Sequence, residues 1–267
     1  MQFQDVSQFI ADFINNEVKE RKSEGVVIGL SGGLDSSVTA CLAVKALGRR
    51  NVFGLILPDS KNITPKADID DALLLAKFIG IKYKIIRIST IKKELLKHFP
   101  KNKLAQGNLA ARLRMSILYY YAAILRRLVM GTSDKSELKL GYYTKYGDNA
   151  VDLLPIAGLY KTEVRKLGRF LAIPPSILQK KSSARLWKGH TAEGEIGMPY
   201  EEVDEILKFL DTNALNGYNN RDAINKLGLS TQKITRLVQF IEKNRHKQDS
   251  PPICEIPNEK LISVNQI

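Results

Sequence analysis

Residues 26–37, VVIGLSGGLDSS, decide the fold of this chain. The first five residues form a mostly apolar run that predicts a buried strand, and VTACLAVKAL at residues 38–47 predicts a helix that stops at Gly48. The turn between them holds two glycines, three serines and one aspartate. A strand that enters a helix through such a turn is typical of a parallel α/β unit.

The same alternation of strand and helix continues along the chain. Further strands are predicted at residues 51–59 (NVFGLILPD), 83–88 (YKIIRI) and 127–132 (RLVMGT). Helices are predicted over residues 5–22, from a cap at Thr64 and Pro65 to Gly80, and over residues 105–126. After about residue 158 the pattern is mainly helical, with a polar interruption over residues 180–199. We therefore expect an α/β fold with a doubly wound, mostly parallel sheet and helices on both faces, in one domain over residues 1–267 with a helical C-terminal part.

Composition limits the classes of function. A chain of 267 residues with 44% hydrophobic residues is large enough to bury a core. No run approaches the roughly 18 consecutive apolar residues of a membrane span, and the N-terminus lacks the basic-then-apolar order of a signal peptide. Cys41 and Cys254 match no metal-ligand spacing, and so few thiols indicate a reducing compartment. We expect a cytoplasmic protein with no membrane partner.

The formal net charge of +13 calls for an anionic partner: nucleic acid, an acidic surface or a phosphate-rich small molecule. Much of this charge belongs to dispersed lysines, which are expected on solvated helix faces. Charge alone therefore does not choose among these partners.

The glycine-rich turn has the chemistry of a phosphate site. In a parallel sheet it lies at the carboxyl end of its strand, where backbone N–H groups and the positive end of the helix attract an anion. Gly32 and Gly33 allow close approach, but neither a Walker loop nor a G-x-G-x-x-G fingerprint is present. Asp35 would repel a phosphate unless a cation stood between them, so the turn predicts Mg²⁺.

In this context SGGLDSS resembles the signature turn of the ATP pyrophosphatase superfamily, whose members split ATP between its α- and β-phosphates. From Gly29 to about residue 209 the chain closely resembles ammonia-dependent NAD synthetase. The stretches that carry this resemblance are LPDS (57–60), QGNLAARLRM (106–115), GTSDKSE (131–137), LKLGYYTKYGDNAVDLLPIAGLYKTEVRKLG (138–168) and HK (246–247). The resemblance implies the adenine nucleotide alpha-hydrolase-like fold.

It also implies a reaction. The nicotinate carboxylate of deamido-NAD attacks the α-phosphate of ATP, pyrophosphate leaves, and ammonia then displaces AMP to give NAD. ATP is needed because oxide is a poor leaving group at neutral pH and AMP is a good one.

Site residues follow from matching motif positions. The resemblance implies that Asp35 and Glu137 hold Mg²⁺ and that Lys161 binds phosphate, and we take these three as the catalytic set. Asp35 and Glu137 follow the first and fourth strands, which would be neighbours at a doubly wound switch point. The implied ATP-binding residues are Gly29, Leu30, Ser31, Gly32, Gly33, Leu34, Asp35, Ser36, Thr132, Lys161 and Ser183, the last where the family often has threonine. The implied deamido-NAD residues are Arg112, Lys145, Asp152, His246 and Lys247.

Ammonia itself is the expected nitrogen donor. Glutamine-dependent relatives carry an additional glutaminase domain with a cysteine nucleophile, which we do not expect here; Cys41 and Cys254 both have structural settings. Ammonium must lose a proton, and carboxylates such as Asp152 are candidates for the relay. The polar stretch at residues 182–198, with few apolar anchors, is interpreted as a mobile cover that excludes water. The apolar helix LAARLRMSILYYYAAIL indicates burial or a partner helix, and the resemblance implies a homodimer.

Two other functions fit the first turn. A tRNA-modifying ATP pyrophosphatase would explain the basic charge, but no separate basic domain or Cys-x-x-Cys pair is present and TKYGD would be unexplained. A non-catalytic nucleotide-binding module would not need Asp35, Glu137 and Lys161 together. We therefore expect an enzyme with no nucleic-acid partner.

Overall fold

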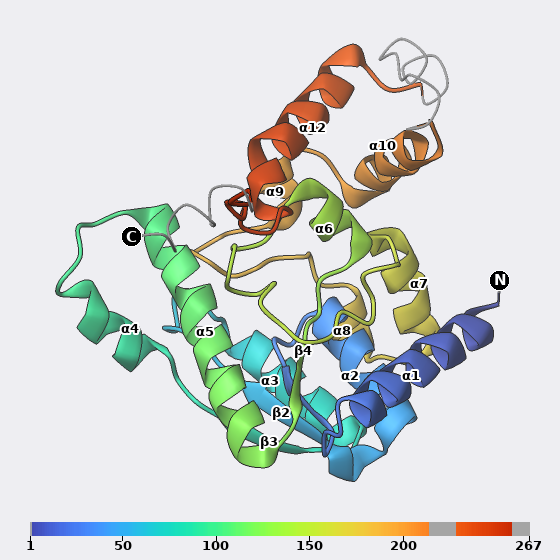
Figure 1. Cartoon of the computed structure of the whole chain (residues 1–267), viewed down its shortest axis with the longest axis vertical. Coiled ribbons are helices and arrows are strands. Elements are labelled where there is room, and N and C mark those ends of the chain that lie inside the picture. Colours follow the sequence, from blue (N-terminus) through green and yellow to red (C-terminus); the bar gives the residue numbers. More distant parts are fainter. Residues whose placement is uncertain (1, 214–227, 258–267) are drawn as a thin grey trace.

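The computed structural model describes residues 2–213 and 228–257, and its described part is built on a four-stranded parallel sheet (Figure 1). The strands are β1 (Val26–Gly29), β2 (Val52–Ile56), β3 (Lys82–Ile85) and β4 (Leu128–Met130). Their order is β3-β2-β1-β4, and all three pairings are parallel. The chain adds β2 and β3 on one side of β1 and then returns to place β4 on the other side. The switch point expected between the first and fourth strands is therefore confirmed.

Helices cover both faces of this sheet, as the sequence predicts. Val26 and Ile28 pack into one apolar cluster, whereas Val27 points to a second cluster on the other face. The first cluster contains side chains of α1 (Phe3–Glu20), α2 (Leu34–Leu47), α3 (Lys66–Phe78), α7 (Lys161–Phe170) and α8 (Pro175–Leu178). The second contains side chains of α5 (Lys103–Leu125), and α4 (Ser89–Leu96) lies beside α5. Figure 1 shows α5 and α1 on opposite sides of the strands.

The C-terminal part forms a third apolar cluster, which is centred on buried Tyr200 and Ile234. It joins α6 (Lys135–Leu140), α9 (Ala192–Ile196), α10 (Tyr200–Asn213) and α12 (Thr231–Asn244). Two 3₁₀ turns, Arg49–Asn51 and Arg245–Lys247, complete the described elements. In Figure 1, α10 and α12 lie beyond α6, away from β2 and β3. This cluster holds α6, which follows β4, against the helices that follow the polar stretch.

The structure corrects two local expectations. Thr64 does not cap α3, because its Oγ1 accepts a hydrogen bond from the Asp59 backbone N–H (3.0 Å) and the helix begins after Pro65 without a side-chain cap. The polar stretch at residues 182–198 also has more apolar anchors than we expected. Ile196 and Met198 are buried in the C-terminal cluster, so the end of this stretch is fixed.

No helix in the described ranges is both long enough and apolar enough to cross a membrane.

Candidate active site

The turn between β1 and α2 is shaped by two glycines. Gly32 has φ of +71°, and a Cβ atom there would lie 2.0 Å from the carbonyl oxygen of Asp68, so only glycine fits. Gly33 occupies the N-cap position of α2, and no side chain caps the helix. The hydroxyls of Ser36 and Ser37 instead donate to the Gly33 carbonyl (3.1 and 2.7 Å). The first backbone N–H groups of α2 are therefore left for an anionic ligand.

A pocket of about 270 Å³ opens beside this turn, at the carboxyl ends of β1, β2 and β4. Most of the predicted ATP residues line it: Gly29, Leu30, Ser31, Gly33, Leu34, Asp35, Ser36, Thr132 and Ser183, with Glu137 also in its wall. Gly32 lies in the same turn but is packed against α3, and Lys161 lies behind the wall. The pocket has an apolar side formed by Leu55, Ile56 and Met130, which suits a nucleobase, and a polar side around the turn.

Lys161 joins the two predicted metal ligands. Its Nζ lies 2.8 Å from Asp35 Oδ2, 2.9 Å from Glu137 Oε1 and 2.8 Å from Asp134 Oδ2, and its side chain is fully buried. Burial alone would lower the pKa of Lys161, but attraction to the three carboxylates raises it well above 10.5. Lys161 is therefore a permanent cation at the centre of the cluster. In this structure its ammonium contacts these three carboxylates, and its contact with phosphate stays a prediction.

The cluster retains excess negative charge. Three ionised carboxylates and one ammonium would sum to −2 (−3 + 1), but burial raises the pKa of Glu137 to about 8 and that of Asp134 to about 6. With Glu137 protonated at neutral pH the sum is −1 (−2 + 1), so a bound cation would displace a proton as well as neutralise charge. Asp35 Oδ1 is buried and has no hydrogen-bond partner. Among the described residues, no group of three or more His, Cys, Asp or Glu side chains is arranged to hold a metal ion by itself. A divalent cation would need further oxygen ligands, which substrate phosphates and water supply in Mg²⁺ sites.

The predicted deamido-NAD residues separate into two places. Arg112 donates to the Lys145 carbonyl (3.2 Å), Lys145 Nζ donates to the His246 carbonyl (2.7 Å), and Lys247 Nζ donates to the Gly141 carbonyl (2.8 Å). The structure thus brings these four predicted residues together, outside the wall of the pocket.

Asp152 lies elsewhere. Its carboxylate accepts hydrogen bonds from the Val129 backbone N–H (2.7 Å) and from the Tyr119 hydroxyl (3.2 Å). The Asp152 carboxylate therefore links β4 to α5 through its two oxygens, and the side chain does not line the pocket.

The two cysteines have different surroundings. Burial raises the pKa of the Cys41 thiol to about 11, so it carries little thiolate at neutral pH. Cys254 is exposed near the C-terminal end of the described chain. Neither lines the pocket.

A family model described as NAD synthase matches residues 6–251. The chain belongs to the NAD synthase family. It is 44% identical over 260 residues to the NH(3)-dependent NAD(+) synthetase of Methanosarcina acetivorans, covering 96% of this chain and 100% of that protein. Two solved structures resemble this NAD synthase chain over 96% of its length and 100% of theirs. One is an NMN synthetase from Francisella tularensis (TM-score 0.82, 34% identity), and the other is an NH3-dependent NAD synthetase from Campylobacter jejuni in complex with a nitrate ion (TM-score 0.80, 38% identity).

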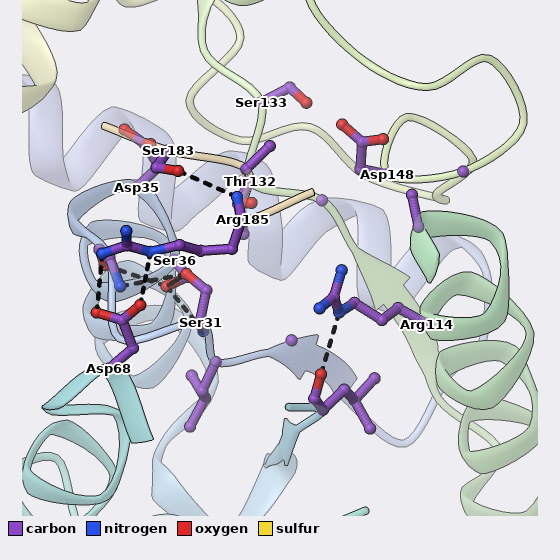
Figure 2. A pocket seen from close by; sticks show the side chains of 18 of the residues that line it. Ser31, Asp35, Ser36, Asp68, Arg114, Thr132, Ser133, Asp148, Ser183 and Arg185 are labelled. Atoms are coloured by element: carbon purple, nitrogen blue, oxygen red, sulfur yellow. Dashed lines mark hydrogen bonds and ion pairs between the residues drawn. The ribbon is translucent and has the colours of Figure 1, made fainter. Parts of the chain in front are cut away.

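Sequence reasoning missed several charged residues of this NAD synthase pocket. Arg114 extends from α5 into the pocket, where its Nε donates to the Leu57 carbonyl (3.0 Å) (Figure 2). The motif LAARLRM could have indicated a separate role for Arg114. Residues two apart on a helix lie on different faces, so Arg112 and Arg114 cannot both contact the same group. The sequence could also have predicted Asp134 as the N-cap of α6, because aspartate is favoured at that position. In the structure its carboxylate accepts a hydrogen bond from the Glu137 backbone N–H (2.9 Å).

Other pocket residues left no local signal. Arg185 and Asp68 meet across 117 positions of sequence, and Asp148 reaches the pocket from the loop after α6. Only the tertiary structure brings these side chains together.

Proposed function

We propose that this protein amidates the nicotinate carboxylate of deamido-NAD with ammonia, consuming ATP and releasing AMP and pyrophosphate. Membership of the NAD synthase family supports the reaction class. The single observation that carries the proposal is the Asp35–Lys161–Glu137 arrangement beside the uncapped N-terminus of α2. It combines an anion site with paired carboxylates, which is what cleavage of ATP between its α- and β-phosphates requires.

The triphosphate is proposed to lie against the turn at Gly32 and Gly33, where the first N–H groups of α2 are directed at it. The apolar side of the pocket takes the adenine, and Thr132 and Ser183 lie in its wall. The Ser183 hydroxyl donates to the His190 carbonyl in this structure, so it would have to leave that carbonyl to donate to ATP. These assignments make the pocket an ATP site whose reacting α-phosphate lies close to the carboxyl ends of β1 and β4.

Asp35 and Glu137 are proposed to hold Mg²⁺ together with ATP. The unpartnered Asp35 Oδ1 and the excess charge of the cluster support this assignment. When bound, Mg²⁺ neutralises charge on the phosphates and helps pyrophosphate to leave. Lys161 fixes the positions of the two carboxylates through its ion pairs with both.

The chemistry is balanced in two steps. A carboxylate oxygen of the nicotinate forms a bond to the α-phosphorus as the bond to pyrophosphate breaks. The nitrogen of ammonia then bonds to the carbonyl carbon, AMP leaves with the shared oxygen, and one proton must be taken up. Asp148 is better placed than Asp152 to take this proton, because it lines the pocket and burial raises its pKa.

The second substrate is proposed to reach the pocket past Arg112, Lys145, His246 and Lys247. Their shared cluster of positive charge suits a dinucleotide that carries a pyrophosphate and a carboxylate. The nearby helix α5 exposes Leu104, Tyr120 and Ile124, and we propose that a second copy of the chain covers this surface.

The similarity to an NMN synthetase gives a second candidate, amidation of the mononucleotide rather than the dinucleotide. The two alternatives drawn from the turn alone, RNA modification and nucleotide sensing, have no support from the family model over residues 6–251. A mass-spectrometric assay with ATP, Mg²⁺ and either deamido-NAD or nicotinate mononucleotide, each with ammonium or glutamine, separates these functions. We expect NAD, AMP and pyrophosphate in equal amounts from deamido-NAD with ammonium alone. NMN as the main product would favour the second candidate, and no amide from either substrate would refute the proposal.

A further inference from the structure

An ion pair connects two walls of the pocket. Arg185, in the polar stretch after α8, lies with its Nε 2.7 Å from Asp68 Oδ2 and its Nη2 3.3 Å from Asp68 Oδ1. Asp68 belongs to the first turn of α3, and the carbonyl of the same residue packs against Gly32 of the phosphate turn. Figure 2 shows the Arg185 side chain reaching Asp68 beside the turn that carries Ser31 and Ser36. Both partners line the pocket.

Asp68 does not depend on Arg185 for its neutralisation. Lys180 Nζ lies 2.9 Å from Asp68 Oδ1 and also donates to the Gly32 carbonyl (2.9 Å). Asp68 is 4% exposed, so a carboxylate left alone there would be costly. Because Lys180 would remain, Arg185 can leave Asp68 without stranding a buried charge.

Besides Arg185, the described residues that line the pocket include the basic side chains of Arg114, Lys180 and Lys181. Arg114 lies on α5 and donates to the Leu57 carbonyl, and the exposed Lys181 carries an ammonium without the planar fork that matches phosphate oxygens. Lys161 is enclosed by three carboxylates, and Lys180 is held by Asp68, Asp71 and the Gly32 carbonyl. Arg185 has one carboxylate partner, its side chain is 29% exposed, and its planar guanidinium matches phosphate oxygens. Its backbone has φ of +49°, which is uncommon for a residue with a side chain.

We infer that Arg185 is a phosphate-binding residue that exchanges Asp68 for the β- and γ-phosphates of ATP, drawing the segment at residues 181–187 onto the nucleotide. This inference rests on the proposed function for the identity of the ligand, and it assigns the binding role to a residue that the family motifs do not. In the free protein Asp68 holds Arg185 beside the phosphate turn, so the guanidinium is already positioned when ATP arrives.

The test measures nucleotide binding without the second substrate. Trp187 is the single tryptophan of the chain and lies two residues from Arg185, so its fluorescence reports on this segment. ATP, ADP and AMP are titrated with Mg²⁺ into the native protein and into R185A, R185K, D68N and K188A. Lys188 is the matched control, because it is an exposed cation directly after this segment. Thermal unfolding establishes that each variant is folded.

We expect R185A to weaken ATP binding roughly tenfold or more and to leave AMP binding nearly unchanged, because only the outer phosphates lose a charge-assisted contact. R185K should recover part of the loss, K188A should match the native protein, and D68N should bind ATP as well as or better than the native protein. If Arg185 merely fastens the segment to α3, R185A and D68N will weaken ATP and AMP alike, and the inference is wrong. Failure of amidation with intact, Arg185-dependent ATP binding would instead count against the proposed function alone.

Discussion

Lys161 and Asp35 are separated by 126 positions of sequence, yet Lys161 Nζ donates a hydrogen bond of 2.8 Å to Asp35 Oδ2. This contact links the first residue of α7 to the first turn of α2, on two helices that follow different parts of the sheet. Through Glu137 the same ammonium also reaches α6. Three chain segments that contribute to the site are thus held by one buried cation.

Lys161→Met should be both destabilising and inactive. Removing the ammonium leaves the fully buried Asp134 and the partly buried Asp35 and Glu137 without their partner, and breaking a buried ion pair in this way costs about 3–5 kcal/mol. Urea unfolding measures the loss, with Lys166→Met as the control because Lys166 is an exposed lysine of the same helix. Native stability in K161M would mean that the carboxylates do not need this cation.

Gly32→Ala should abolish ATP binding. The new Cβ would lie 2.0 Å from the Asp68 carbonyl oxygen, so the turn and α3 would have to separate. Gly48→Ala is the control for conformational strain: φ there is +75°, but nothing lies within 4 Å of the added atom. We expect G48A to cost about 1 kcal/mol or more and to bind ATP normally. Titration of both variants with ATP measures the difference, and equal binding would show that contact with Asp68 is not critical.

Asp211 should make the free energy of unfolding depend on pH. It accepts hydrogen bonds from Lys139 and Tyr160 and pairs with Lys135 (2.6 Å), joining α10 to α6. Burial alone would raise the pKa of Asp211, but these partners lower it from 3.8 to about 2. Because the folded pKa is lowered, the carboxylate stabilises the fold above about pH 4, and this stabilisation is lost as the pH falls towards 2.

Asp211→Asn should therefore lower the free energy of unfolding by about 1–2 kcal/mol at pH 7. The difference between native and variant protein should shrink as the pH falls below 4. Urea unfolding at several pH values measures it, and a difference that does not change with pH would contradict the assignment.

The exposed face of α5 should mediate self-association. Tyr120 and Ile124 are 66% and 58% exposed, although both are large apolar side chains. A Tyr120→Glu, Ile124→Glu double variant should be monomeric by light scattering if the native protein is a dimer through α5. Phe9→Glu on α1 is the control, since Phe9 is 77% exposed on the opposite side of the sheet. A native monomer, or dissociation by F9E alone, would refute the α5 interface.

Sequence periodicity and turn chemistry were sufficient to predict the parallel sheet and the phosphate turn after its first strand, whereas the pairing of Asp35 with Glu137 came from the resemblance to NAD synthetase. The sheet and the turn depend on local patterns and on the general topology of parallel sheets. The enclosure of Lys161 was not predictable in this way, because its burial depends on Asp134 and on packing against Tyr200 from the C-terminal cluster. The Thr64 hydroxyl could likewise have accepted a hydrogen bond either from the first turn of α3 or from the backbone after β2. In the structure it accepts from the Asp59 backbone N–H, which follows β2.

The most direct test of the central claim follows oxygen from the carboxylate. Deamido-NAD labelled with ¹⁸O in its nicotinate carboxylate is incubated with ATP, Mg²⁺, ammonium and the native protein, and the products are analysed by mass spectrometry. Attack of the carboxylate on the α-phosphate predicts one labelled oxygen in AMP and none in pyrophosphate. Formation of ADP with labelled inorganic phosphate, or AMP without the label, would contradict the account.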